Sequence, residues 1–178
     1  MDLEKLKYPI GKFSCPTEIS EEELKMWLNI IEKFPARLEI LVADLNDEQL
    51  DTTYRPDGWT VRQVIHHCAD SHLNSILRFK WALTENVPTI KPYDQDGWAK
   101  LGDSLEAPIE FSISLLKSLH AKWVYLLRKL TKEDLKKTFY NPETEKELTL
   151  ETTIGIYSWH CEHHYSHIAN LIKNKNWK

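Results

Sequence analysis

The sequence predicts an all-α protein, a four-helix bundle with a long connection between its second and third helices. Four stretches of roughly 20 residues place apolar side chains at helical spacing, which is typical of such bundles. Two of these stretches follow capping-box patterns, Ser20 to Glu23 and Thr60 to Gln63, which mark helix starts. Only five of the 178 residues are glycine, which favours helices over a turn-rich β protein.

The first two helices can be bounded from these signals. The first should begin at about residue 21, and its apolar stripe continues to Leu45. Pro35 lies inside this stripe and is expected to kink or interrupt the helix, because proline lacks an amide hydrogen and clashes with the preceding turn. The second helix should follow Thr60 and extend to about Leu83.

The second half of the chain is expected to supply the other two helices. Residues 85–107 contain two prolines and two glycines and are expected to form a long connection with little regular structure, which is often functional. Helices are predicted over 108–130 and from about Thr149 to Lys173. The whole chain, 1–178, has the usual length of one domain.

Composition excludes several classes of protein. The net charge of −4 gives no support for nucleic-acid binding, which needs a concentrated basic surface. The N-terminus is charged and lacks a secretory apolar segment, and no stretch is apolar enough for a membrane span. Cys15, Cys68 and Cys161 form no CxxC pattern and leave one thiol unpaired, so we expect reduced cysteines, the last two in the core, and a cytoplasmic protein.

Four of the eight histidines lie close together near the C-terminus. On a helix, residues four apart have Cβ atoms about 5–6 Å apart, so His160/His164 and His163/His167 are both candidate pairs for one metal ion. At roughly 100° per residue, His164 and His160 lie closer to the apolar face of the helix than the other two. We therefore predict His160 and His164 as metal ligands. Cys161 replaces the glutamate of an HExxH motif, which argues against peptide hydrolysis.

A third ligand is expected from the second helix. His72 lies within the apolar stripe and is slightly favoured by its position, whereas His67 lies at the polar edge, where a site open to substrate would be lined. Both remain candidates on this reasoning. His120 is expected to be a hydrogen-bonded packing residue. Three further histidines are expected at the surface: His66, His163 and His167.

Two motifs resemble a known family. The segment GWTVRQVIHHCADSH at 58–72, combined with WHxxxH at 159–164, resembles the DinB/YfiT-like superfamily over nearly the whole chain. Three shorter segments resemble the YfiT branch of this superfamily: YPIG at 8–11, KPYD at 91–94 and FYxP at 139–142. Members of this branch are named as metal-dependent hydrolases and are related to bacillithiol S-transferases.

The resemblance implies a four-helix bundle of DinB/YfiT type, a homodimer, and one divalent metal ion, zinc or nickel, held by three histidines. Carried over residue by residue, the ligand positions fall on His67, His160 and His164. It therefore selects His67 over His72.

Three functions are compatible with such a site. Open coordination positions on a metal lower the pKa of bound water to about 7 or stabilise a thiolate. We expect a thiol (bacillithiol) S-transferase acting on electrophilic small molecules, which the resemblance favours. The alternatives are a hydrolase that uses a metal-bound hydroxide, and a non-catalytic stress-response binding module whose structural metal has four protein ligands. No general base is evident beyond Asp70, Glu162 or a spare histidine, so no catalytic residue is assigned.

Overall fold

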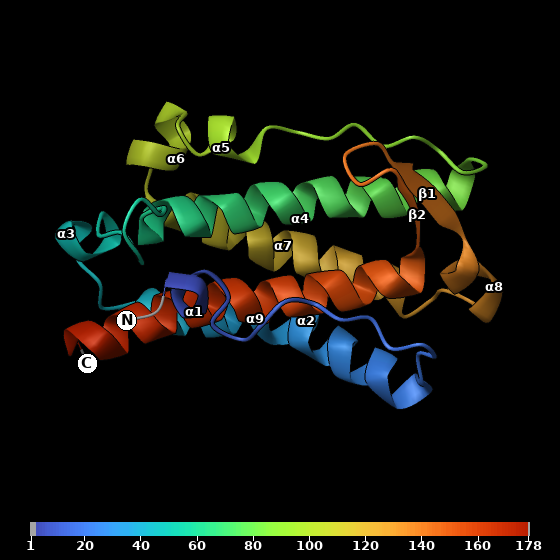
Figure 1. The fold of residues 1–178 in the computed structure, drawn as a ribbon, viewed down its shortest axis with the longest axis horizontal. Helices are drawn as coiled ribbons and strands as arrows, with labels where there is room; N and C mark the ends of the chain where they lie inside the picture. Colours follow the sequence, from blue (N-terminus) through green and yellow to red (C-terminus); the bar gives the residue numbers. More distant parts are fainter. Residues whose placement is uncertain (1–2, 178) are drawn as a thin grey trace.

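The computed structural model describes residues 3–177 and consists mainly of four long helices packed side by side (Figure 1). They are α2 (Glu21–Val42), α4 (Val61–Thr84), α7 (Ile109–Leu127) and α9 (Leu150–Lys175). The predicted four-helix bundle is thereby confirmed. No helix within the described residues is long and apolar enough to cross a membrane. Residues 1, 2 and 178 of the predicted domain lie outside the described part.

The helices are connected in an order that places parallel neighbours together. α2 and α9 run in one direction, whereas α4 and α7 run in the other (Figure 1). α2 packs against α9 and α7, and α4 packs against the same two helices. The parallel pair α4 and α7 therefore needs a long crossover to return the chain to the same end of the bundle.

Short elements complete the described chain. They are α1 (Leu3–Lys7), α3 (Asp47–Leu50), α5 (Gln95–Trp98), α6 (Gly102–Glu106), α8 (Lys132–Lys136), β1 (Thr138–Asn141) and β2 (Lys146–Thr149). The crossover was expected to have little regular structure, but it contains α5 and α6. The two strands form an antiparallel hairpin, and their four-residue length is too short for a clear alternating pattern in the sequence.

The predicted helix starts are confirmed by their caps. Ser20 and Thr60 each form both halves of a capping box, and Thr149 accepts a hydrogen bond from an amide in the first turn of α9. The expected effect of Pro35 is partly wrong, because α2 is not interrupted there. The buried apolar residues on either side pack into the bundle and maintain the helix. Since Pro35 has no amide hydrogen, the Ile31 carbonyl lacks the hydrogen bond that residue 35 would normally donate.

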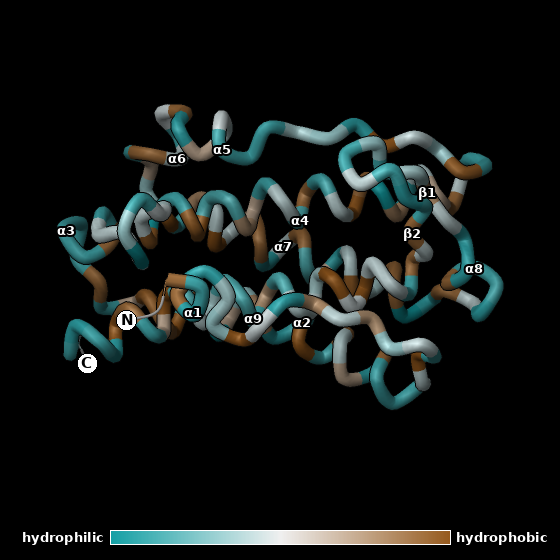
Figure 2. Tube along the Cα trace, viewed as in Figure 1, coloured by the Kyte–Doolittle hydropathy of each residue, from teal (hydrophilic) through white to brown (hydrophobic). Residues whose placement is uncertain are grey.

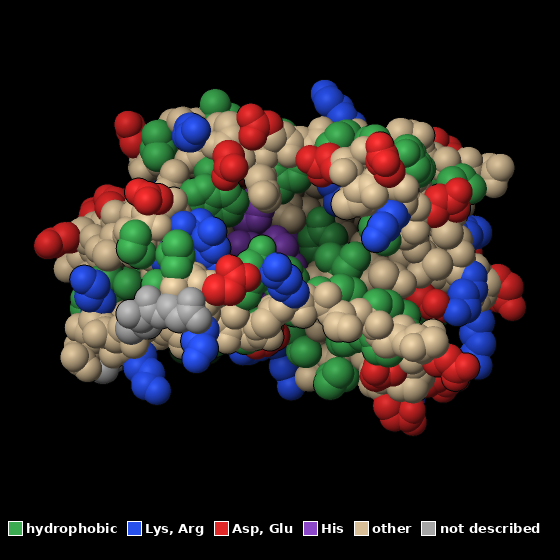
Figure 3. Space-filling model, viewed as in Figure 1, with side chains coloured by type: hydrophobic (Ala, Val, Ile, Leu, Met, Phe, Trp, Pro, Cys, Tyr) green, Lys and Arg blue, Asp and Glu red, His purple; other side chains and the backbone are tan. Residues whose placement is uncertain are grey.

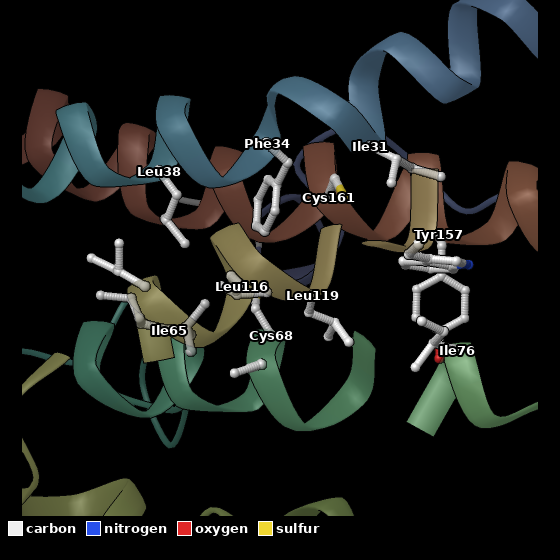
Figure 4. Close-up of a cluster of buried hydrophobic side chains, with 14 of the residues drawn as sticks. Ile31, Phe34, Leu38, Ile65, Cys68, Ile76, Leu116, Leu119, Tyr157 and Cys161 are labelled. Atoms are coloured by element: carbon white, nitrogen blue, oxygen red, sulfur yellow. The ribbon is translucent and has the colours of Figure 1, made fainter. Parts of the chain in front are cut away.

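The core lies between the inner faces of the long helices. Hydrophobic residues recur along these faces, with hydrophilic ones turned outward (Figure 2). Phe34 and Leu38 of α2 lie near Ile65 of α4 in one apolar cluster (Figure 4). Cys68 and Cys161 are fully buried in this cluster, as predicted for small apolar residues. A histidine-rich layer interrupts this apolar interior.

Candidate metal centre

Three imidazoles from two helices meet inside the bundle. His67 lies on α4, and His160 and His164 lie one turn apart on α9; one ring nitrogen of each lies within 4.8 Å of the others. The Nε2 atoms of His67 and His160 are 3.2 Å apart. Two nitrogens bound at roughly 2.0–2.1 Å to a tetrahedral ion would lie roughly 3.3–3.4 Å apart. The three predicted ligands thus have a spacing that suits one ion, and their binding of a metal stays a prediction.

This triad lines a cavity of about 880 Å³. Histidine side chains are visible at the bottom of a hollow beside α4, with Lys and Arg side chains at its edge (Figure 3). Trp59 and Trp159 also line the cavity, and the Trp59 ring centroid lies 4.6 Å from that of His67. We did not predict these two tryptophans as site residues, although both stand beside the histidine motifs in the sequence.

The triad has open positions towards the cavity. No fourth His, Cys, Asp or Glu joins this group within residues 3–177. Cys161, the neighbour of His160, points into the apolar cluster (Figure 4), where burial raises the pKa of its thiol. An ion in the triad would therefore keep coordination positions for a substrate or water.

Burial keeps the imidazoles of the triad neutral at pH 7. It lowers the pKa of His67 to about 4. Burial, reinforced by the neighbouring imidazoles, lowers the pKa of His160 and His164 well below the usual value. A neutral imidazole has one nitrogen lone pair free, and this is the form that binds metal ions. The triad therefore fits a divalent cation electrostatically.

A chain of hydrogen bonds crosses the core and ends on His160. Nδ1 of His120 lies 2.6 Å from the carbonyl oxygen of Ile31. Nε2 of His120 lies 2.7 Å from Nδ1 of His72, and Nε2 of His72 lies 3.0 Å from Nδ1 of His160. His72, slightly favoured as a ligand by its helical position, lies behind a triad member instead of within the triad. His120 is a buried, hydrogen-bonded residue, as predicted.

The expectation that His163 and His167 lie at the surface is wrong. Nε2 of His167 lies 3.0 Å from the Lys7 carbonyl oxygen, to which it donates, because a carbonyl can only accept. The His163 ring stacks on Trp159 at a centroid distance of 4.3 Å. The prediction considered only the position of these residues on the helix within the bundle. The N-terminal segment, residues 3–11, covers this side of α9.

His66 is also buried, contrary to the prediction. Its Nδ1 lies 2.7 Å from the Ser112 hydroxyl and its Nε2 lies 3.2 Å from the Ala107 carbonyl oxygen. Both partners belong to the segment around the start of α7, which covers the outward face of α4 at this point. Only the packing of distant segments reveals this burial.

A second histidine group adjoins the triad. Ring nitrogens of His163, His164 and His167 also lie within 4.8 Å of one another, and all three residues belong to α9. In each, Nδ1 is buried and has no hydrogen-bond partner in the described part of the protein. Burial lowers the pKa of His163 to about 3 and that of His167 to about 4. The cavity thus contains neutral imidazoles beside the triad.

Known proteins match the chain over nearly its full length. "Putative metal-dependent hydrolase YfiT" of Bacillus subtilis (strain 168) is 47% identical over 172 residues, which cover 97% of each chain. "Putative metal-dependent hydrolase" of Bacillus cereus (strain 03BB102) is 52% identical over 172 residues, covering 97% of this chain and 98% of the relative. A solved structure of Bacillus subtilis YfiT, described as an unusual four-helix bundle, matches with a TM-score of 0.96.

The structural match has 46% sequence identity and covers 98% of this chain and 99% of the other. The family model described as the DinB superfamily matches residues 30–168, which include all the triad positions. The names of the relatives agree with histidine groups that are able to hold a metal. Family model, full-length relatives and fold agree, and the chain belongs to the DinB superfamily.

Proposed function

We propose that this protein is a metal-dependent S-transferase in which His67, His160 and His164 hold one zinc or nickel ion. The thiol of a small molecule such as bacillithiol attacks an electrophilic substrate, so that a sulfur–carbon bond forms as the leaving group departs. When bound, the ion would supply the Lewis acidity that favours thiolate over thiol at neutral pH. The observation that carries this proposal is a triad that opens onto a large cavity.

The open triad also weakens the interpretation as a binding module. A structural zinc site is normally closed by four protein ligands, often including cysteine. Here the group has three histidines within the described chain, and Cys161 faces the apolar core. An ion held this way keeps positions that chemistry can use.

The charge of the cavity favours an anionic thiol. Lys7, Arg55 and Lys100 line it, against two acidic side chains, Asp57 and Asp96. Bacillithiol carries the carboxylates of a malate group, which such cations can bind by charge-assisted hydrogen bonds. A cytoplasmic location, where such thiols remain reduced, agrees with the three free cysteines.

Thiol transfer also fits the positions of the carboxylates. Asp70 and Glu162, the acidic candidates for a general base, are not among the described residues that line the cavity. Glu162 is ion-paired with Arg37, at 3.1 Å between Oε2 and Nη2. A thiol whose pKa is lowered by a metal needs no separate base to become a nucleophile.

Hydrolysis is the second candidate, because the relatives are named as metal-dependent hydrolases. Its structural support is His163, which lines the cavity and is neutral at pH 7. A neutral imidazole can accept the proton of an attacking water. This reaction would use a small ester, amide or related bond.

A homodimer is the proposed assembly. α4 and α7 pack side by side and expose large apolar side chains: Leu73, Leu77, Phe111 and Leu115. Single exposed apolar residues are common, but several on adjoining helices favour a protein contact. Sedimentation of the protein should give the mass of two chains, and Phe111→Glu should lower it to that of one.

One experiment separates the candidate functions. Zinc- or nickel-loaded protein is incubated with bacillithiol and monochlorobimane, and conjugate formation is expected to depend on the metal and to disappear in His164→Ala. His66→Gln is the control, since His66 lies on α4 next to a triad residue but outside the cavity lining. Metal-dependent cleavage of activated esters without conjugation would favour hydrolysis. Inertness in both assays would favour the binding module.

A further inference from the structure

The proline inside α2 stands at one end of the hydrogen-bond chain that reaches His160. Proline at position 35 cannot donate to the carbonyl four residues earlier, and its ring clashes with that carbonyl. That carbonyl belongs to Ile31, and its oxygen lies 2.6 Å from Nδ1 of His120. The His120 imidazole therefore bonds to a carbonyl that, in a helix without proline, would accept a hydrogen bond from the amide of residue 35.

The first link determines the proton positions in the next two. A carbonyl oxygen can only accept a hydrogen bond, so Nδ1 of His120 carries the proton. Burial lowers the pKa of His120 to about 4, so its ring is neutral at pH 7 and its Nε2 is an acceptor. The partner at 2.7 Å, Nδ1 of His72, must therefore donate.

The same argument reaches the metal triad. His72 is completely buried among aromatic rings, where a charged imidazole is disfavoured, and a neutral His72 with a proton on Nδ1 has an acceptor at Nε2. Nδ1 of His160 lies 3.0 Å from this atom and must donate to it. The lone pair of His160 is then on Nε2, the atom that faces Nε2 of His67 at 3.2 Å.

Aromatic side chains surround this chain of hydrogen bonds and exclude water from it. The His72 ring lies 5.5 Å from the Phe34 ring and 5.3 Å from the Tyr157 ring, and His120 lies 5.8 Å from the Trp123 ring, all measured between centroids. In such surroundings an unpaired imidazole nitrogen is costly. Each link therefore depends on the next, back to the Ile31 carbonyl.

We propose that Pro35 is a positioning residue for the metal centre: it frees the Ile31 carbonyl to anchor the chain His120–His72–His160, which presents Nε2 of His160 to the ion. The proposal rests on the proposed function, since it assumes that His160 is a metal ligand. Partners of this kind fix the tautomer and orientation of metal-binding histidines. Here the partner is a backbone carbonyl on another helix, reached through two further imidazoles.

Metal-free protein provides the direct test. In protein labelled with ¹⁵N at histidine, long-range ¹H–¹⁵N spectra distinguish a proton on Nδ1 from one on Nε2. We expect Nδ1–H in His120, His72 and His160 of the unchanged protein, and a mixture of tautomers at His160 in Pro35→Ala and in His120→Phe. Leu38→Val is the packing control, because Leu38 is a buried residue of α2 outside the chain.

Metal affinity gives the second readout. Titration with Zn²⁺ or Ni²⁺ should show a Kd at least about tenfold higher in His120→Phe, within the range typical of partners behind a ligand. Pro35→Ala should show a smaller rise, at least about threefold, and Leu38→Val none.

Two results would overturn the proposal: a proton on Nε2 of His160 in the unchanged metal-free protein, or unchanged tautomers and affinity in Pro35→Ala. If the unchanged protein binds no metal, the proposed function fails instead, and the spectra of the metal-free protein still test the anchoring of His160.

Discussion

The two histidine groups of the cavity have similar ligand spacings but are supported differently. His67, His160 and His164 come from two helices, and His160 is hydrogen-bonded through the core to the Ile31 carbonyl. The group of His163, His164 and His167 comes from one helix and is supported from outside by the N-terminal segment.

This difference indicates which group should hold the ion. A metal-binding histidine needs its second nitrogen engaged, so that the tautomer and the ring orientation are fixed before the ion arrives. The core chain does this for His160. In the second group His167 is held by a segment at the surface. His163 contacts the rings of Trp159, Tyr8, His164 and His167, but its Nδ1 has no hydrogen-bond partner among the described residues. We expect the ion in the first group.

The largest expected effect is on metal affinity. His67→Ala removes a ligand of the first group only, and should raise the Kd for Zn²⁺ or Ni²⁺ at least about 100-fold, beyond the usual loss for a supporting residue. His163→Phe keeps a ring against Trp159 and removes a nitrogen of the second group only. Its Kd should stay within about threefold of the original, well below the range for residues that support a metal. Calorimetric titration measures both, and equal losses would mean that the second group takes part.

The next largest effect is expected on the pH dependence of folding stability. The pKa of His67 is lowered by burial from 6.5 to about 4, so between these values the unfolded state binds more protons than the folded state. The stabilisation from this residue is therefore complete above pH 6.5 and is lost as the pH falls towards 4. For His67 alone this amounts to about 3 kcal/mol.

Denaturant unfolding of the metal-free protein at several pH values measures this loss. His67→Ala should have a shallower pH dependence than the original protein over this range. An identical dependence in the two proteins would contradict the low pKa of His67. The corresponding measurement on His163→Phe compares the second group directly, since burial lowers the pKa of His163 to about 3.

A smaller effect is expected at Cys161, which lies between His160 and His163 in the sequence. Cys161→Ser places a hydroxyl in the apolar cluster without a partner and should reduce the free energy of unfolding by about 1–3 kcal/mol. Metal affinity should not change, because the thiol faces away from both groups. A raised Kd would instead assign Cys161 to the metal centre.

The smallest effect is expected where the N-terminal segment meets the second group. His167→Ala removes the hydrogen bond to the Lys7 carbonyl and should cost about 1 kcal/mol of stability. His167→Gln retains a donor for the same oxygen and should cost less. Thermal unfolding with limited proteolysis of the N-terminal segment measures both. Equal stability of the two variants would show that this contact does not hold the segment.

Much of the architecture was predictable from local patterns. Capping boxes and apolar periodicity located the four long helices to within a few residues, because both depend on neighbours along the chain. The hairpin at β1 and β2 was missed, since each strand has four residues. The burial of His163 and His167 was missed because a segment outside the bundle covers them, and that of His66 was missed because the segment around the start of α7 packs over it.

The sequence by itself determined four amphipathic helices and an inward-facing pair, His160 and His164, since helical periodicity relates residues only a turn apart. It left His67 and His72 as alternatives for the third position, and only the family resemblance distinguished them. The tertiary structure placed His67 within the triad and His72 behind it. The chain from Pro35 through His120 and His72 to His160 was decided by the tertiary structure alone, because hydrogen bonds between four helices depend on how those helices pack, which no local spacing encodes.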